Sequence, residues 1–200
     1  MFYMSQNKYI ISKEVMIYLK HKPYVLEALE QEIINYSALA RKIKKDLGNV
    51  NFEAVKTTII RIAKDLRNKK KQRELKIINL LKKADFSINN KIATIHHISP
   101  LNIESIAFSK TPSGYMYFVK ENIAEKSTFK KIDYGYAIIH IKSPKEIEDT
   151  PGVAAFLLST LASENINVVH LMDCREDTFL VIKEFNAPLS FRVLSEALRI

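Results

Sequence analysis

The segment EIEDTPGVAAFLLSTLASENINVVHL, residues 146–171, constrains the fold more than any other part of the sequence. It places Gly152, one of only four glycines in 200 residues, between Pro151 and a run of small and apolar residues. Proline stiffens the chain, and a glycine lets the backbone lie close to a neighbour. The first N–H groups of the helix that follows have no partners within it, so they attract a carboxylate. The segment predicts an anion-binding loop, although a tight strand-to-helix turn needs the same glycine.

Strands and helices alternate around this loop. We expect strands at 134–141, 166–172 and in TFLVIKE, a helix at 153–162, and a closing helix that Asn186 caps. The order strand-helix-strand-strand-helix is typical of a ferredoxin-like sheet with two helices on one face. The fold class that we predict is therefore α+β.

The sequence DTPGVAAFLLSTLASENINVVHLMDCREDTFLVIKE resembles the ACT domain, the amino-acid-sensing module of aspartokinases and related regulators. The matching features are the Pro-Gly-Val-Ala-Ala start, the Leu-Ala spacing in the helix and the Asn-Ile-Asn-Val that leads into the next strand. The resemblance implies that an amino acid or similar small carboxylate binds the glycine loop and the strand start, between two paired domains of a homodimer. The implied ligand-binding residues are Asp149, Thr150, Gly152, Val153, Asn167 and Val168.

Residues 85–132 bear on how that domain is completed. An ACT domain has a fourth strand after its second helix, and only a few residues follow the second helix here. Either a strand from 85–132 completes the sheet, or this segment is a degenerate second ACT-like unit in tandem with the first. Within it, NKIATIHHIS is rich in β-formers, and ESIAFSKTPSGYMYFVK predicts two strands around a TPSG turn.

Helix signals divide residues 1–84 into several helices. Ser12 is a candidate cap for the first, and Pro23 suits the first position of PYVLEALEQEII. Ser37 is a candidate cap for the helix in NYSALARKIKKDLG, which its glycine would end in a left-handed conformation. After the GNVN break, Asn51 is a candidate cap for a helix that continues through ELKIINLLKKA.

The three helices around the GNVN break resemble the helix-turn-helix of DNA-binding proteins, whose last helix lies in the major groove. The last helix has donors for phosphates and base edges opposite its apolar stripe. The candidate DNA-binding residues are Lys56, Thr57, Arg61, Lys64 and Asn68. A purely structural helical unit and an RNA-binding unit are the alternatives. No β-hairpin wing follows this helix, so we expect a connector helix that serves dimerisation or links two domains.

Charge is distributed unevenly along the chain. Residues 1–83 contain 19 Lys+Arg and 8 Asp+Glu, a net charge of +11, whereas the remaining residues contain 12 and 14, a net charge of −2. This asymmetry favours double-stranded DNA as the partner of the N-terminal part, with a generic solubilising surface as the alternative.

Composition and cysteine usage argue against a membrane, secreted, disulfide-bonded or metal-binding protein. No apolar run approaches the roughly 18 residues that a membrane span needs, and the N-terminal residues lack the pattern of a secretory signal. Cys174 is the single cysteine, which excludes an intramolecular disulfide and gives no metal-binding spacing. We therefore expect a cytoplasmic protein without a membrane span, metal, cofactor or catalytic residues.

A helix-turn-helix followed by an ACT domain resembles a family of small archaeal-type proteins described as predicted regulators of amino-acid metabolism, of which NYSALARKI is also typical. We predict a helix-turn-helix domain with its connector at 1–84, a β-rich segment at 85–132 and an ACT domain at 133–200. The function that we predict is amino-acid-responsive transcription regulation, without enzyme activity. The competing hypothesis is a regulatory subunit that does not bind DNA and confers amino-acid feedback on a biosynthetic enzyme.

Overall fold

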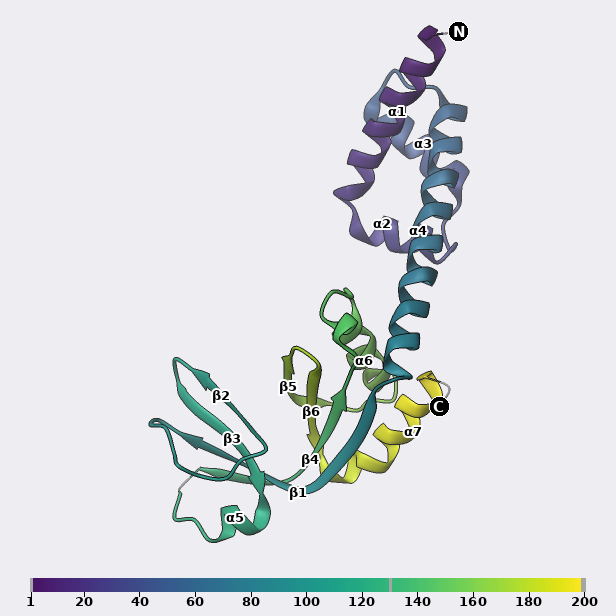
Figure 1. Cartoon of the computed structure of the whole chain (residues 1–200). Coiled ribbons are helices and arrows are strands. Elements are labelled where there is room, and N and C mark those ends of the chain that lie inside the picture. The colour runs from purple at the N-terminus through teal and green to yellow at the C-terminus, as the bar shows by residue number, and fades with distance from the viewer. Residues whose placement is uncertain (1, 130, 199–200) are drawn as a thin grey trace. The chain divides into compact units, whose positions relative to one another are not determined.

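The computed structural model describes residues 2–129 and 131–198. It divides the chain into two units, Met1–Glu74 and Leu75–Ile200, which we call unit 1 and unit 2. Figure 1 shows helices in unit 1 and a mixed arrangement of strands and helices in unit 2. The predicted α+β class is confirmed.

Unit 1 is built from helices whose apolar stripes face one another. They are α1 (Phe2–Lys20), α2 (Pro23–Glu30), α3 (Tyr36–Leu47) and the part of α4 (Phe52–Leu81) that precedes Leu75. Their shared core consists of Val15, Leu19, Val25, Leu29, Leu39, Ala40, Ile43, Val55, Ile59, Ile62 and Ala63. The 3–4 spacing of these residues along each helix is the pattern that makes one face of a helix apolar.

The ends of α3 and the start of α4 follow from their capping residues. The Asn51 side chain accepts a hydrogen bond from the Ala54 amide at 3.0 Å, as predicted. Gly48 ends α3 with a positive φ of 83°, as predicted, but its ψ of −113° lies outside the left-handed helical region that was expected. The expected Ser37 cap is wrong, because Asn35 accepts the capping hydrogen bond from the Ala38 amide at 3.0 Å. The helix therefore begins one residue before the serine.

Two further details differ from the sequence-based expectation. α1 begins at Phe2, so Ser12 lies inside the helix, and its hydroxyl accepts a hydrogen bond from Arg61 instead of capping. α2 ends at Glu30, and Glu32 adopts a positive φ of 58°, which turns the chain. Ile33, expected on the apolar stripe, is 73% exposed for this reason.

α4 is one continuous helix of 30 residues, so no wing hairpin interrupts it. The expectation that the chain stays helical through ELKIINLLKKA is confirmed as far as Leu81, where α4 ends, and the last three residues of that segment lie outside the helix. Whether this helix and its neighbours bind DNA stays a prediction, because helices of this kind also occur as purely structural units.

Unit 2 contains a curled antiparallel sheet of six strands in the order β2-β3-β1-β4-β6-β5 (Figure 1). Its strands are β1 (Asp85–His97), β2 (Ala107–Thr111), β3 (Gly114–Lys120), β4 (Ile132–Lys142), β5 (Val168–Cys174) and β6 (Asp177–Lys183). Its α-helices after α4 are α5 (Glu121–Glu125), α6 (Val153–Ala162) and α7 (Ala187–Leu198). The expected strand-helix-strand-strand-helix order is therefore present from β4 to α7.

β1 takes the place in the sheet next to β4. It runs antiparallel to β4, from the pair Asp85–Lys142 to the pair Ile95–Ile132, on the edge of β4 opposite β6. In a ferredoxin-like sheet the last strand lies beside the first, so β1 fills that place from upstream in the chain. A bulge between Asn89 and Ile92 bends β1, and its second half also pairs with β3.

The two faces of β4 and β6 contribute to different cores because side chains alternate along a strand. On one face, Ile139 and Leu180 pack with Leu157 of α6 and Leu194 of α7. On the other face, Ile138 and Val181 pack with Phe118 of β3. The rings of Phe118 and His170 lie 5.2 Å apart, so the sheet curls enough for β3 to meet β5.

Candidate functional site

The loop between β4 and α6 has the conformation that its Pro-Gly pair predicts. Gly152 stands at the N-terminus of α6 with φ 96° and ψ 2°, a left-handed conformation that side chains disfavour. No side chain among the described residues caps this helix start. The Phe156 amide is bonded to the Gly152 carbonyl at 2.9 Å, so the amides ahead of it precede the helical hydrogen-bond series.

Hydrogen bonds within the loop fix its shape. The Thr150 hydroxyl donates to the Glu146 carbonyl at 2.8 Å, and the Thr150 amide donates to the Ile147 carbonyl at 3.0 Å. Thr150 is 5% exposed, whereas Asp149 is exposed. Of these two predicted ligand residues, Thr150 thus holds the loop in place and Asp149 faces solvent.

The turn between β5 and β6 forms hydrogen bonds with the same loop, a contact that the sequence did not predict. The Glu176 carbonyl accepts a hydrogen bond from the Ser143 amide at 2.7 Å. Arg175, with a positive φ of 59°, donates through Nε to Glu148 at 3.5 Å. The Ser143 hydroxyl is buried and has no partner among the described residues. The order of the strands could have suggested this contact, since it places both segments at one end of the sheet.

The predicted strand residues lie at the other end of the sheet. Val168 pairs with Ile182 at the start of β5, whereas Cys174 pairs with Asp177 at its end, beside the loop. α6 connects the two ends with ten residues, which corresponds to roughly 15 Å. Asn167 is exposed and Val168 is half-buried. Within one chain, the loop residues and the strand residues are therefore not brought together.

The predicted DNA-binding residues follow one side of α4. Thr57, Arg61, Lys64 and Asn68 are exposed, whereas Lys56 is half-buried. The spacings of four, three and four residues from Thr57 to Asn68 place those four residues along one stripe of the helix, as expected, and Lys56 lies beside that stripe.

Some basic groups on or beside this stripe have partners within unit 1. The Arg61 guanidinium donates to the Ser12 hydroxyl of α1 at 2.5 Å. Further along α4, Arg67 forms an ion pair with Glu32, and Lys70 forms one with Glu30 at 3.1 Å. These contacts neutralise part of the basic run that the sequence places after residue 66.

The histidines of β4 and β5 lie apart, as expected, because β6 separates the two strands. His140 contacts the Asp177 carboxylate at 2.6 Å and stacks on Phe179 with ring centroids 4.5 Å apart. Burial lowers the pKa of His170, because the apolar surroundings disfavour the charged imidazole. Among the described residues, no group of three or more His, Cys, Asp or Glu gathers where it could hold a metal ion.

Comparison with solved structures identifies proteins of similar fold. A Vibrio cholerae protein of unknown function, described as a possible transport protein, is 13% identical over 62% of this chain and 96% of its own, with a TM-score of 0.50. The regulatory subunit of aspartate kinase from Thermus flavus is 13% identical over 59% of this chain and 98% of its own, with a TM-score of 0.47. The regulatory subunit of aspartate kinase from Thermus thermophilus is 13% identical over 57% of this chain and 95% of its own, with a TM-score of 0.45. At this identity the likeness concerns the fold alone.

Comparison with models of protein families finds no match, and comparison with curated proteins finds none. In the part of the chain that the structure describes, none of the helices combines the length and apolar character that a membrane crossing requires.

Proposed function

We propose that this protein is an amino-acid-responsive regulator in which unit 2 senses an amino acid or similar small carboxylate. The observation that carries the proposal is the left-handed Gly152 at the uncapped start of α6. Amides at a helix start, together with the positive end of the helix dipole, favour a carboxylate at this position. Val153 contributes the first amide of the helix, and the exposed Asp149 offers an acceptor for an ammonium group.

The second half of the site comes from another copy of the chain. Asn167 offers both a donor and an acceptor, which suits the two charged ends of an amino acid. It lies at the opposite end of the sheet from Gly152, so two copies related by a two-fold axis would join the loop of one to the strand start of the other. The proposal therefore includes a homodimer with two equivalent ligand sites.

A thermal-shift screen of the twenty amino acids tests the sensing role. A ligand that binds only the folded state raises the melting temperature, and the shift grows with ligand concentration. We expect one or a few amino acids to raise it, and Gly152→Ala to abolish the shift. Gly135→Ala is the matched control, because Gly135 also has a positive φ of 78° and the added Cβ meets open space. If none of the twenty raises the melting temperature, the sensing proposal fails.

The output that we propose for unit 1 is binding of double-stranded DNA through α4. The net charge of +11 on residues 1–83 and the exposed Arg61 and Lys64 support it. The logarithm of the affinity falls with the logarithm of the salt concentration, and each phosphate contact adds about 0.9 to the magnitude of this slope. Replacing both residues by methionine should therefore reduce the magnitude of the slope by about 1.8. Lys126→Met with Lys145→Met changes the charge equally in unit 2 and should leave the slope unchanged. An unaltered slope in the Arg61 and Lys64 variant would refute this assignment.

The alternative output is feedback on a biosynthetic enzyme through direct binding, without DNA. The ion pairs of Arg67 and Lys70 favour it, because they reduce the charge that α4 offers to a polyanion. Affinity capture with the full chain distinguishes the two outputs. A biosynthetic enzyme recovered after nuclease treatment favours the alternative, whereas retention on duplex DNA favours the transcription regulator. Stronger retention on single-stranded RNA would indicate the RNA-binding hypothesis. Under either main output the protein is a sensor and not an enzyme.

A further inference from the structure

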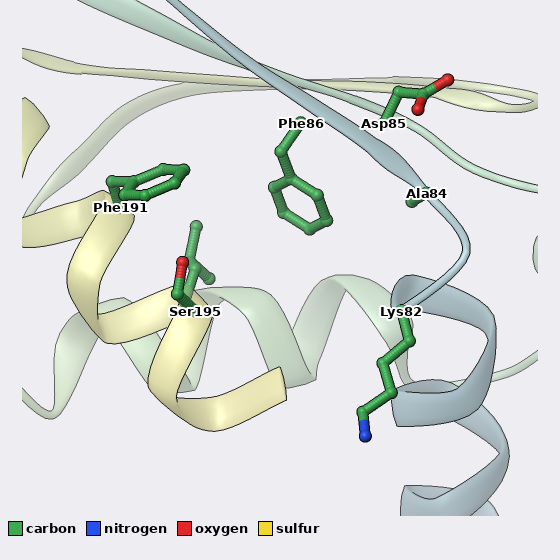
Figure 2. Close-up of a pocket in the computed structure, with 7 residues that line it drawn as sticks. Lys82, Ala84, Asp85, Phe86, Phe191 and Ser195 are labelled. Atoms are coloured by element: carbon green, nitrogen blue, oxygen red, sulfur yellow. The ribbon is translucent and has the colours of Figure 1, made fainter. Parts of the chain in front are cut away.

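A hollow between the start of β1 and α7 lacks polar groups that converge on one point. Figure 2 shows the Lys82 side chain running away from Phe86 and Phe191, which line the same hollow. A groove in unit 1 differs from it, because aromatic and charged side chains are in contact there. This groove has a volume of about 290 Å³ and lies where the end of α1, the start of α2 and the start of α3 meet.

The groove has an apolar floor with two tyrosines beside it. Its apolar lining residues are Val25, Ile34, Ala38 and Leu39. Val25 and Leu39 belong to the buried core of unit 1, so they form the floor. Tyr18 and Tyr24 also line the groove, and Tyr24 is 68% exposed, which leaves a large aromatic surface in contact with water. An apolar side chain bound here would remove this surface from water and extend the core.

Lysine side chains gather around Tyr18. The Lys22 ammonium lies over the Tyr18 ring, 4.6 Å from its centroid. The Tyr18 hydroxyl donates to the Asp46 carboxylate at 2.5 Å, and the Lys42 ammonium lies 3.8 Å from the same carboxylate oxygen. The hydrogen bond from Tyr18, together with the nearby lysine ammonium groups, holds the pKa of the Asp46 carboxyl below its usual range. Those lysines are Lys22, Lys42 and Lys45, so three positive charges surround one negative charge, a net charge of +2.

We propose that this groove binds a protein partner that presents an acidic amphipathic helix. Apolar side chains three and four residues apart on that helix fill the groove beside the tyrosines, and its carboxylates pair with Lys22 and Lys42. The positive charge at the groove selects an acidic partner. Duplex DNA is also negative, but it presents no aliphatic side chain to the apolar floor. The groove shares no residue with the Gly152 loop or α4, so this inference goes beyond the function proposed above.

Fluorescence anisotropy with synthetic peptides tests the partner chemistry on the full chain. The probe is a fluorescein-labelled peptide of sequence ELLEELLEELLE, which is acidic and has an apolar stripe when helical. The peptide KLLKKLLKKLLK reverses its charge, and EAAEEAAEEAAE lacks its large apolar side chains. We expect saturable binding of the probe, and at least about tenfold weaker binding of each control peptide. Absence of probe binding, or equal binding of either control peptide, would overturn the proposal.

Two pairs of variants locate the bound probe. Lys42→Glu should weaken binding by at least about fivefold, whereas Arg41→Glu, which reverses the charge of an exposed neighbour outside the lining, should change it little. Tyr24→Ala should weaken binding by at least about fivefold, whereas Ile33→Ala, at a 73% exposed position outside the lining, should not. The melting temperature of each variant establishes that it is folded. If the two members of either pair bind the probe equally, the proposal is wrong.

Two further measurements distinguish the other occupants that this groove could have. Retention of a short DNA duplex should be equal for Lys42→Glu and Arg41→Glu, and a loss confined to Lys42→Glu would assign the groove to nucleic acid. Sedimentation velocity should show the same association state for Tyr24→Ala and the wild type, and a dimer that the variant converts to a monomer would assign the groove to a second copy. Either result would overturn the proposal. The thermal-shift screen with amino acids and the salt dependence of the Arg61 and Lys64 variant are separate measurements, so failure here can be distinguished from failure of the proposed function.

Discussion

Mixing two inactive variants should restore part of the ligand binding. Gly152→Ala alters the loop half of the candidate site, and Asn167→Ala alters the strand half. Each variant alone forms homodimers in which both sites lack one half. In a mixed dimer, the unaltered loop of one chain meets the unaltered strand start of the other, so one of its two sites is intact. Co-expression should therefore recover binding that neither variant has by itself.

Binding is recovered because the two halves of the site are separated within one chain, and the size of the recovery follows from random pairing of the chains. The ten residues of α6 place Gly152 and Asn167 roughly 15 Å apart along the helix, so one chain cannot join them around a single amino acid. Random pairing of equal amounts of two chains gives about half mixed dimers, each with one intact site of two, hence about a quarter of the wild-type sites. Gly152→Ala also costs about 1–2 kcal/mol of stability through its positive φ, which the Gly135→Ala control reproduces.

Calorimetry with the amino acid that gives the largest thermal shift measures the number of sites in the mixture. Both chains are co-expressed with different tags, and the doubly tagged dimer is isolated to measure its stoichiometry directly. One site per mixed dimer is the expected result. A mixed dimer without any binding would refute the reasoning, because it would mean that both halves of the site belong to one chain.

Three further predictions concern stability and follow from single positions. Gly114→Ala should destabilise the protein by at least about 2 kcal/mol more than Gly48→Ala in urea unfolding, because its Cβ would lie 2.6 Å from a backbone oxygen of β1, whereas Gly48 has open space; equal losses would contradict this. Asn35→Ala should lower the free energy of unfolding by about 1 kcal/mol and Ser37→Ala by much less, because Asn35 caps α3. A larger loss from Ser37→Ala would mean that the serine is the cap. Burial lowers the pKa of His170, so below about pH 6.5 the unfolded chain binds more protons than the folded one, and stability should fall on acidification. His170→Gln should reduce that fall. An identical dependence of stability on pH in the variant and the wild type would contradict this prediction.

Much of the local structure could be predicted because its causes are local. Asn51 caps α4, Gly48 ends α3, and the Pro-Gly pair precedes α6, each through hydrogen bonds or backbone angles that involve only neighbouring residues. The choice between Asn35 and Ser37 could not be predicted in this way. Both side chains cap helices well, and Tyr36 packs against the core of unit 1 as the first helical residue, which favours the asparagine.

The sequence by itself determined the order of strands and helices from β4 to α7, the glycine conformation at the loop and the charge difference between the two parts of the chain. Only the tertiary structure decided that β1 completes the sheet beside β4, and that the loop and the start of β5 lie at opposite ends of one chain. The physical reason is the range of the interactions. Caps, turns and periodic burial act over a few residues, whereas strand pairing joins Asp85 to Lys142 and depends on the packing of the whole unit.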